Sequence, residues 1–172
     1  PGHHRAIIVI EHQSCRSVGG GGEASPGACL GEEVPAATVP VVEDGYRWNG
    51  ETYRHRRKRV AFISGDFRTH PVGYLLIGMI ERMDKRRFEI TGVSTGAPDG
   101  SDLWKRYRCA FDHYLDVQGK PSLEIAQLMR AMEIDIAIDL SGHTEGSRLD
   151  VLAHRPAEWR AFMAYHDALL LK

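Results

Sequence analysis

Hydrophobic positions fall into two alternating patterns from residue 58 onward. Short apolar runs rich in Val, Ile and Phe predict buried strands, at residues 59–64, 88–94, 113–117 and 134–140. Apolar residues spaced three, four and seven apart predict helices, over residues 72–83, 101–111 and 123–132. A short helix near 149–153 and a fifth strand within 159–165 complete the pattern. Strands that alternate with helices predict an α/β fold built on a Rossmann-like parallel sheet.

The first predicted helix has an apolar stripe that we expect to face the sheet, formed by Leu75, Leu76, Met79, Ile80 and Met83. Two further helices have candidate N-cap residues. Ser101 or Asp102 precedes the second helix, and Ser122 precedes the third.

Residues 1–50 lack either pattern and are rich in Gly, Pro and Ala. Such a stretch buries too little apolar surface to offset the entropy lost on ordering. We therefore expect a poorly ordered or linker-like segment at 1–50 and a single domain at 51–172. Trp48 and Tyr53 are expected to pack on the edge of that domain.

Basic and acidic residues nearly cancel, with 22 Lys and Arg against 23 Asp and Glu. The chain therefore has no global charge that would hold nucleic acid or an anionic membrane. Its apolar runs are shorter than the roughly 18–20 residues of a membrane span. We expect neither nucleic acid nor membrane as a partner. The densest basic run, RHRRKR at 54–59, is interpreted as a solvated segment before the first strand.

Cys15, Cys29 and Cys109 are odd in number and lack the spacing of a metal site. This count argues against a disulfide framework and favours a reducing compartment. No signal peptide is recognisable, so we predict a cytoplasmic protein. Because no metal-site spacing occurs, we expect no metal. The chain does not begin with Met, which favours a fragment of a longer protein.

The first candidate site is the segment Ser64–Pro71, SGDFRTHP, which follows a predicted buried strand. Pro71 suits the first turn of a helix and places His70 at the helix N-terminus. The positive end of a helix favours a neutral imidazole, which can accept a proton from a hydroxyl. The alternative is that His70 serves as a helix cap. Asp66 either supports His70 or caps the turn through its own backbone.

The second candidate site is the segment 141–148, SGHTEGSR, which follows another predicted buried strand. Gly142 and Gly146 flank Thr144 in a flexible polar loop whose backbone N–H groups are suited to an anion or a sugar. Arg148 offers a planar fork for a carboxylate or a phosphate. The alternative is an ordinary turn with Arg148 on the helix surface. Neither GxGxxG nor GxxxxGK[ST] occurs here.

At these two loops the chain resembles the catalytic region of the protein O-linked N-acetylglucosamine transferases and the related SPINDLY proteins. Four stretches carry the likeness, in order, over residues 57–157: KRVAFISGDFRTHPVGYLL, RRFEITGVSTGAPDGSDLWKRY, FDHYLDV and IAQLMRAMEIDIAIDLSGHTEGSRLDVLAHRPA. The family pattern is a strand ending in S-x-D-F-x-x-H-P, a D-G-S/T loop, and a strand ending in G-Y/H-T-x-G-x-R.

The resemblance implies one lobe of a two-lobed GT-B glycosyltransferase. Such an enzyme transfers N-acetylglucosamine from UDP-GlcNAc to Ser or Thr of a protein, with inversion, and needs no metal or other cofactor. The likeness implies that His70 is the catalytic histidine. It also implies that Asp66, Pro71 and the loop residues Gly142, His143, Thr144, Gly146 and Arg148 line the substrate cleft. His143 stands where many members have Tyr, so we assign it no catalytic role.

The second lobe, which supplies most nucleotide-binding residues in this family, has no counterpart here. We therefore expect a first lobe at 51–172 that is inactive alone. One alternative is a non-catalytic α/β binding module derived from such an enzyme. Another is a different GT-B enzyme, such as a sugar-nucleotide epimerase, which the loop sequences disfavour.

Overall fold

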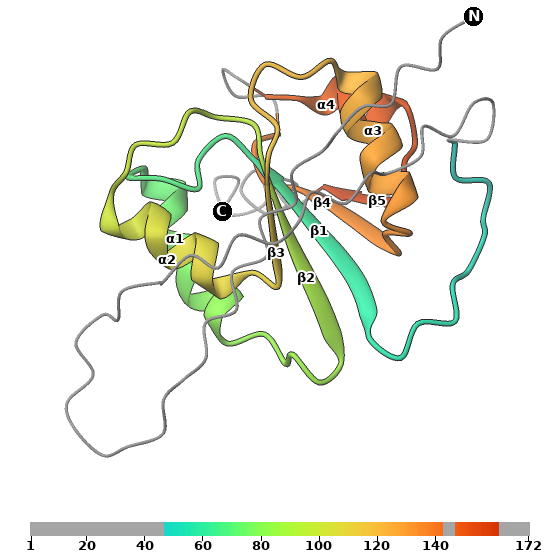
Figure 1. Cartoon of the computed structure of the whole chain (residues 1–172), viewed down its shortest axis with the longest axis horizontal. Coiled ribbons are helices and arrows are strands. Elements are labelled where there is room, and N and C mark those ends of the chain that lie inside the picture. Colours follow the sequence, from blue (N-terminus) through green and yellow to red (C-terminus); the bar gives the residue numbers. More distant parts are fainter. Residues whose placement is uncertain (1–46, 143–146, 162–172) are drawn as a thin grey trace, which may run out of the picture.

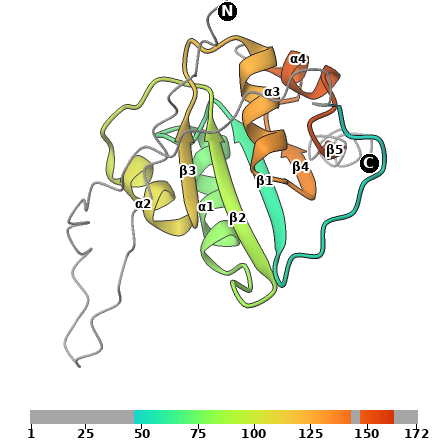
Figure 2. The same ribbon diagram turned by 45° about the vertical axis from the view of Figure 1, so that its right-hand side comes forward.

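The computed structural model describes residues 47–142 and 147–161 and confirms the α/β prediction. It contains a five-stranded parallel sheet in the order β3-β2-β1-β4-β5, which Figure 2 shows side by side. The strands are β1 (Lys58–Ser64), β2 (Phe88–Ser94), β3 (His113–Asp116), β4 (Ile136–Asp139) and β5 (Glu158–Ala161). The helices are α1 (Pro71–Glu81), α2 (Asp102–Ala110), α3 (Ser122–Ala131) and α4 (Leu149–Ala153).

Helices cover both faces of the sheet, and β1 contributes to both cores (Figure 1). Its side chains alternate, so Val60 and Phe62 pack with α1 and α2 on one face. Ala61 and Ile63 pack with α3 and α4 on the other. Burial on both faces explains why the strands read as continuous apolar runs in the sequence.

The stripe predicted for α1 is right for Leu76 and Ile80 but wrong for Leu75 and Met79. The buried residues of α1 are Gly73, Leu76, Ile77 and Ile80, whereas Leu75 is 78% exposed and Met79 is 38% exposed. The reason is the close approach of Gly73 to the preceding loop, since a Cβ there would lie 2.5 Å from the carbonyl oxygen of Arg68. This contact turns Leu75 toward solvent.

Two boundaries also differ. The fourth strand begins at Ile136 rather than 134, because the amide of Ile134 donates to the Met129 carbonyl and ends α3. Ser122 lies inside α3 and is not its cap; Pro121 holds the N-cap position and makes no side-chain cap bond. The Ser122 hydroxyl instead donates to Asp150 at the start of α4.

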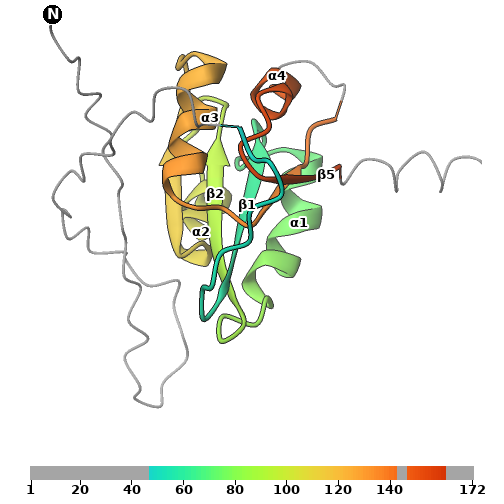
Figure 3. The ribbon, with the colours of Figure 1, turned by 90° about the vertical axis from the view of Figure 1, so that its right-hand side faces the viewer.

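The segment preceding β1 packs along the domain edge, as expected for Trp48 and Tyr53 (Figure 3). The Trp48 amide donates to the Arg155 carbonyl at 2.7 Å, and the Arg155 guanidinium lies over the indole. The Tyr53 hydroxyl accepts a hydrogen bond from Arg130. These contacts attach the segment to both α3 and the turn after α4.

Cys109 on α2 is disulfide-bonded, which goes against the argument from cysteine count that disfavoured disulfides. Cysteine spacing along a chain does not show which thiols meet in space. Within residues 47–142 and 147–161, no helix is long and apolar enough to cross a membrane.

Candidate functional site

The two candidate loops follow the neighbouring strands β1 and β4, at the point where the order of strands in the sheet reverses. From β1 the chain adds β2 and then β3 on one side, and it returns through α3 to place β4 on the other side of β1. The amide of Leu140 donates to the Ile63 carbonyl, so the carboxyl ends of β4 and β1 stay paired. In open α/β sheets this reversal forms the crevice where ligands bind.

Phe67 anchors the β1–α1 loop (residues 65–70) in the core between the sheet and α2. Its side chain is 2% exposed. Its ring centre lies 4.9 Å from that of Tyr107 and 5.1 Å from that of Phe111, both in tilted or edge contacts. Burial in this aromatic cluster fixes the middle of the loop, because well-packed aromatic rings permit little displacement.

Tyr107 on α2 holds the first turn of α1, which follows this loop. Its hydroxyl donates to the Gly73 carbonyl at 2.6 Å. Burial raises the pKa of Tyr107 well above its usual range, so the phenol remains a donor. Gly73 has no room for a side chain, since a Cβ would also lie 2.8 Å from the Asp66 carbonyl oxygen. The first turn of α1 is therefore pressed against the loop.

Asp99, in the D-G-S loop before α2, connects two loops of the carboxyl edge. Its carboxylate accepts from the Thr69 amide at 2.8 Å and from the Ser101 amide at 3.0 Å. The hydrogen bond from the Thr69 backbone, with that from Ser101, holds the pKa of Asp99 well below its ordinary value. Asp99 was not among the residues singled out from the sequence. Its place one residue before a Gly–Ser cap was the available signal.

His70 is the N-cap residue of α1, which confirms that it serves as a cap. Its Nδ1 accepts from the Val72 amide at 3.3 Å and lies 3.4 Å from a carboxylate oxygen of Asp66. The His70 side chain is 40% exposed, whereas that of Asp66 is 17% exposed. The ring is thus held at one nitrogen and open to solvent.

The position of Nδ1 between a donor and an acceptor gives the imidazole two bonding patterns. With Nδ1 unprotonated, it caps the helix through Val72. With a proton on Nδ1, it donates to Asp66 and leaves Nε2 as the basic nitrogen, as in a carboxylate–histidine pair. The same position of the ring serves both patterns, but they exclude each other, because a protonated Nδ1 cannot accept from the Val72 amide. Asp66 is placed to support the second, and its own amide is held by the Ser64 hydroxyl.

The β4–α4 loop (residues 140–148) begins with a turn built on buried Asp139. Its carboxylate accepts from the Gly142 amide at 2.6 Å and from the Ser141 amide at 3.4 Å. Gly142 has φ +58°, which favours glycine. The Ser147 hydroxyl donates to the Gly142 carbonyl and draws the two ends of the loop together.

Arg148 is directed to the N-terminus of α3. Its guanidinium donates to the Lys120 carbonyl at 3.0 Å and to the Ser122 hydroxyl at 2.6 Å, and it lies 3.4 Å from Asp150. Burial raises the pKa of Asp150, but the Ser122 hydrogen bond and the Arg148 charge outweigh it and leave that pKa lowered. Three protein partners already occupy the fork that the sequence suggested for a ligand.

The structure thus brings Asp66, His70 and Pro71 together after β1, and the Leu140–Ile63 hydrogen bond holds the end of β4, which Gly142 follows, against β1. Arg148 joins the α3 side instead. His143, Thr144 and Gly146 lie outside the described residues. Among the residues described, no group of three or more His, Cys, Asp or Glu side chains is arranged to hold a metal ion.

A family model fits this arrangement. The model of glycosyl transferase family 41 matches residues 29–166. This chain belongs to that family. The match includes both candidate loops and the whole described sheet.

Known members of the family are similar over part of this chain. The probable UDP-N-acetylglucosamine–peptide N-acetylglucosaminyltransferase SEC of Arabidopsis thaliana is 29% identical over 102 residues, which are 59% of this chain and 10% of that protein. The SPINDLY protein of the same plant, with the same probable activity in its name, is 29% identical over 117 residues, 64% of this chain and 12% of that protein.

A solved structure of a mutant Thermobaculum terrenum O-GlcNAc transferase also resembles the chain. The TM-score is 0.60 at 38% identity, over 64% of this chain and 21% of that one. This likeness to a GT-B enzyme confirms the fold class that the loops predicted. The chain spans about a tenth of the length of the curated relatives it matches.

Proposed function

We propose that this chain forms the first lobe of a two-lobed protein O-GlcNAc transferase. The whole enzyme would transfer N-acetylglucosamine from UDP-GlcNAc to Ser or Thr of a protein, inverting the anomeric centre. The observation that supports this most directly is the Asp66–His70 pair on a rigid loop at the sheet reversal, in a chain of family 41. The partners are a sugar nucleotide and a protein or peptide acceptor.

In this proposal His70 acts on the acceptor. The proton of the Ser or Thr hydroxyl moves to Nε2 of His70 as the hydroxyl oxygen bonds to the anomeric carbon and the UDP diphosphate leaves. Asp66 accepts the proton on Nδ1 as a hydrogen bond, which orients the ring and stabilises the cation that forms. The Thr69–Asp99 hydrogen bond and buried Phe67 keep the loop in position during this step.

The exposed side chains of Tyr74 and Leu75 indicate a surface near His70 that another part of the enzyme or its substrate covers. They follow His70 in the first turns of α1 and are 62% and 78% exposed. Exposed adjoining apolar side chains mark surfaces that other protein covers. We propose that the second lobe or the bound acceptor covers them.

Because the donor site is proposed to lie mainly in the other lobe, residues 1–172 alone are expected to show no sugar transfer from labelled UDP-GlcNAc to a Ser-containing peptide. Fusing residues 58–158 into the Thermobaculum terrenum enzyme, in place of the part they match, should restore transfer. No metal enters the proposal, so EDTA should leave the rate of this chimera unchanged. Transfer by the isolated chain would contradict the assignment of the donor site to the other lobe.

His70→Asn in the chimera separates catalysis from capping. Asparagine is a strong N-cap residue, so helix stability is retained while the titratable ring is lost. We expect kcat to fall by at least 100-fold, within the range of general-base catalysis, with an unchanged melting temperature. A His70→Asn chimera as active as its parent would reduce His70 to a cap.

The alternative of a non-catalytic binding module is favoured by one observation, the internal engagement of Arg148. It predicts that a well-folded chimera binds donor or acceptor without any transfer. The same assay therefore decides between the two functions.

A further inference from the structure

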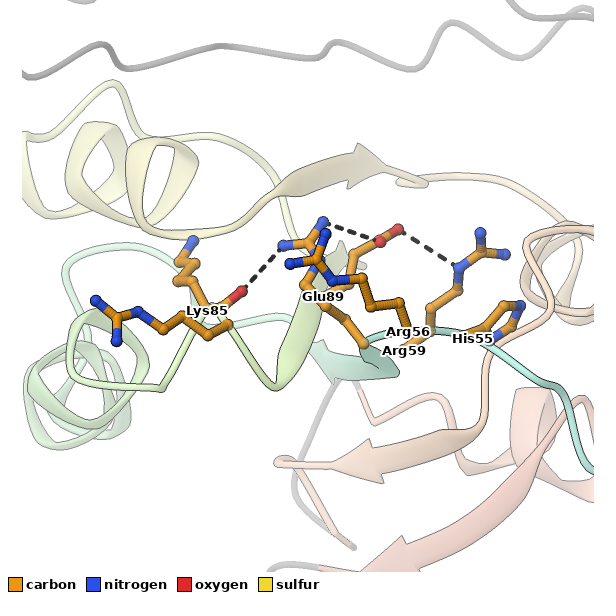
Figure 4. Close-up of a pocket in the computed structure, with 7 residues that line it drawn as sticks. His55, Arg56, Arg59, Lys85 and Glu89 are labelled. Carbon is orange, nitrogen blue, oxygen red and sulfur yellow. Dashed lines mark hydrogen bonds and ion pairs between the residues drawn. The ribbon is translucent and has the colours of Figure 1, made fainter.

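A basic concavity lies at the opposite end of the sheet from the candidate site. It has a volume of about 480 Å³ and is formed where β1 and β2 begin. Its lining consists of His55, Arg56, Arg57, Arg59, Lys85, Arg86 and Glu89. Figure 4 shows Arg56, Arg59 and Lys85 around Glu89, with His55 at one end.

Two arginines of the lining are held in fixed positions by Glu89. Arg57 donates to this carboxylate at 3.0 Å, and Nε of Arg59 lies 3.5 Å from it. Arg59 also donates to the Met132 carbonyl at 2.9 Å. The interpretation of 54–59 as a solvated segment is therefore wrong for these two residues, because they enter ion pairs across the sheet.

Carboxylates around the concavity neutralise only part of its charge. Asp112 lies 3.4 Å from Arg57 and 3.7 Å from Lys85. Glu133 and Asp135 bracket His55, at 2.9 Å and 3.1 Å. Glu133 also lies 3.3 Å from Arg59, and Asp135 pairs with Lys58 outside the lining.

Arg56 and Arg86 are the uncompensated cations of the lining. Both are exposed, and neither guanidinium has an ion pair or hydrogen bond within the described parts of the chain. They come from the approach to β1 and from the turn before β2. The lining thus contains two arginines without a described ion pair and two that are held by Glu89.

We propose that this concavity binds a compact, multiply charged phosphate anion of the diphosphate class. Guanidinium forks match phosphate oxygens in pairs, and such charge-assisted bonds are short and strong. The volume fits a small ligand rather than a folded partner. No Phe, Tyr or Trp is among the lining residues, so a nucleobase has no ring to stack on. The site recognises the phosphates alone.

This site is separate from the crevice at the carboxyl edge. The two lie at opposite ends of the seven-residue strand β1, which spans about 20 Å at the usual rise per residue. Binding here is independent of the proposed transferase function, and either can fail without the other.

Titration of the 15N-labelled full chain with inorganic pyrophosphate tests the proposal. We expect saturable one-to-one binding, with amide shifts at residues 55–59 and 85–89 and none at 65–70. ADP is expected to bind as tightly as pyrophosphate, within about twofold. A nucleotide that binds tenfold more tightly would contradict recognition of phosphate alone.

Arg56→Gln combined with Arg86→Gln should weaken pyrophosphate binding by about tenfold or more, because each lost bond carries charge. Both residues are exposed, so the fold is expected to tolerate the change. Lys105→Gln together with Arg106→Gln removes the same charge from α2 and should leave the affinity unchanged. Equal weakening by both pairs, or shifts confined to residues 65–70, would overturn the proposal.

Discussion

The two loops at the sheet reversal differ in what they leave available for a ligand. The β1–α1 loop is fixed by the Thr69–Asp99 hydrogen bond and by the buried Phe67 ring, and the His70 side chain stays 40% exposed. The end of the β4–α4 loop is held by the Arg148 guanidinium, which hydrogen-bonds to the Lys120 carbonyl and the Ser122 hydroxyl at the start of α3. A side chain of suitable chemistry is therefore available to a ligand only where other groups hold the loop in place.

Different groups hold the two loops in place. In the first loop, Phe67, Asp99 and Tyr107 hold the backbone. In the second, buried Asp139 holds the turn but the far end depends on Arg148. We infer that the first loop presents the reactive side chain.

The largest expected effect follows removal of the ring that anchors the first loop. Phe67→Ala should lower the free energy of unfolding by about 3–5 kcal/mol, the usual cost of emptying a buried aromatic site. Urea denaturation measures it. Phe88→Ala, at the half-buried start of β2, is the control and should cost clearly less. Equal losses would show that Phe67 gives the loop no special support.

Arg148→Met tests whether the second loop depends on its guanidinium. Methionine keeps much of the apolar stem but leaves the Lys120 carbonyl and the Ser122 hydroxyl without their donor. The free energy of unfolding should fall by about 1–3 kcal/mol. Arg54→Met, at an exposed position before β1, should have no measurable effect. If Arg148→Met leaves stability intact while abolishing ligand binding, the comparison between the loops is reversed.

His70→Ala and His70→Asn test whether the hydrogen bond from the Val72 amide to His70 stabilises the chain. Alanine removes the acceptor of the Val72 amide and should destabilise the chain by about 1 kcal/mol, whereas asparagine restores an acceptor and should be nearly neutral. Thermal melting of the chain alone is sufficient. Identical losses for both variants would mean that the bond to Val72 contributes little.

The smallest effect concerns Asp99 and depends on pH. Its folded-state pKa lies below the ordinary 3.8, so its contribution to stability is full above that value and is lost as pH falls toward the folded pKa. Asp99→Asn should therefore lower the melting temperature slightly at pH 7, and the gap from the parent should close below about pH 4. Asp102→Asn is the matched control, because among the described residues the Asp102 carboxylate accepts from Lys105 alone. A gap that widens in acid would contradict the sign.

The order and type of the elements follow from the sequence, because a sheet buried on both faces needs apolar runs and each covering helix needs a one-sided stripe. The resemblance of the loops to a glycosyltransferase likewise needs only the residues between Lys58 and Arg155. The stripe predicted for α1 held for Leu76 and Ile80 but not for Leu75 and Met79, because periodicity does not show that Gly73 lies tight against the preceding loop.

The sequence alone determined the fold class, the strand-end loops and their candidate residues. Only the tertiary structure decided which side chains remain free: it assigned Arg148 to α3, gave Asp99 its place between two loops, and gathered distant arginines at the amino edge. The physical reason is the separation along the chain over which each effect acts. Periodicity and capping act within a few residues, whereas hydrogen bonds and ion pairs join residues that the chain brings together only after the sheet has formed.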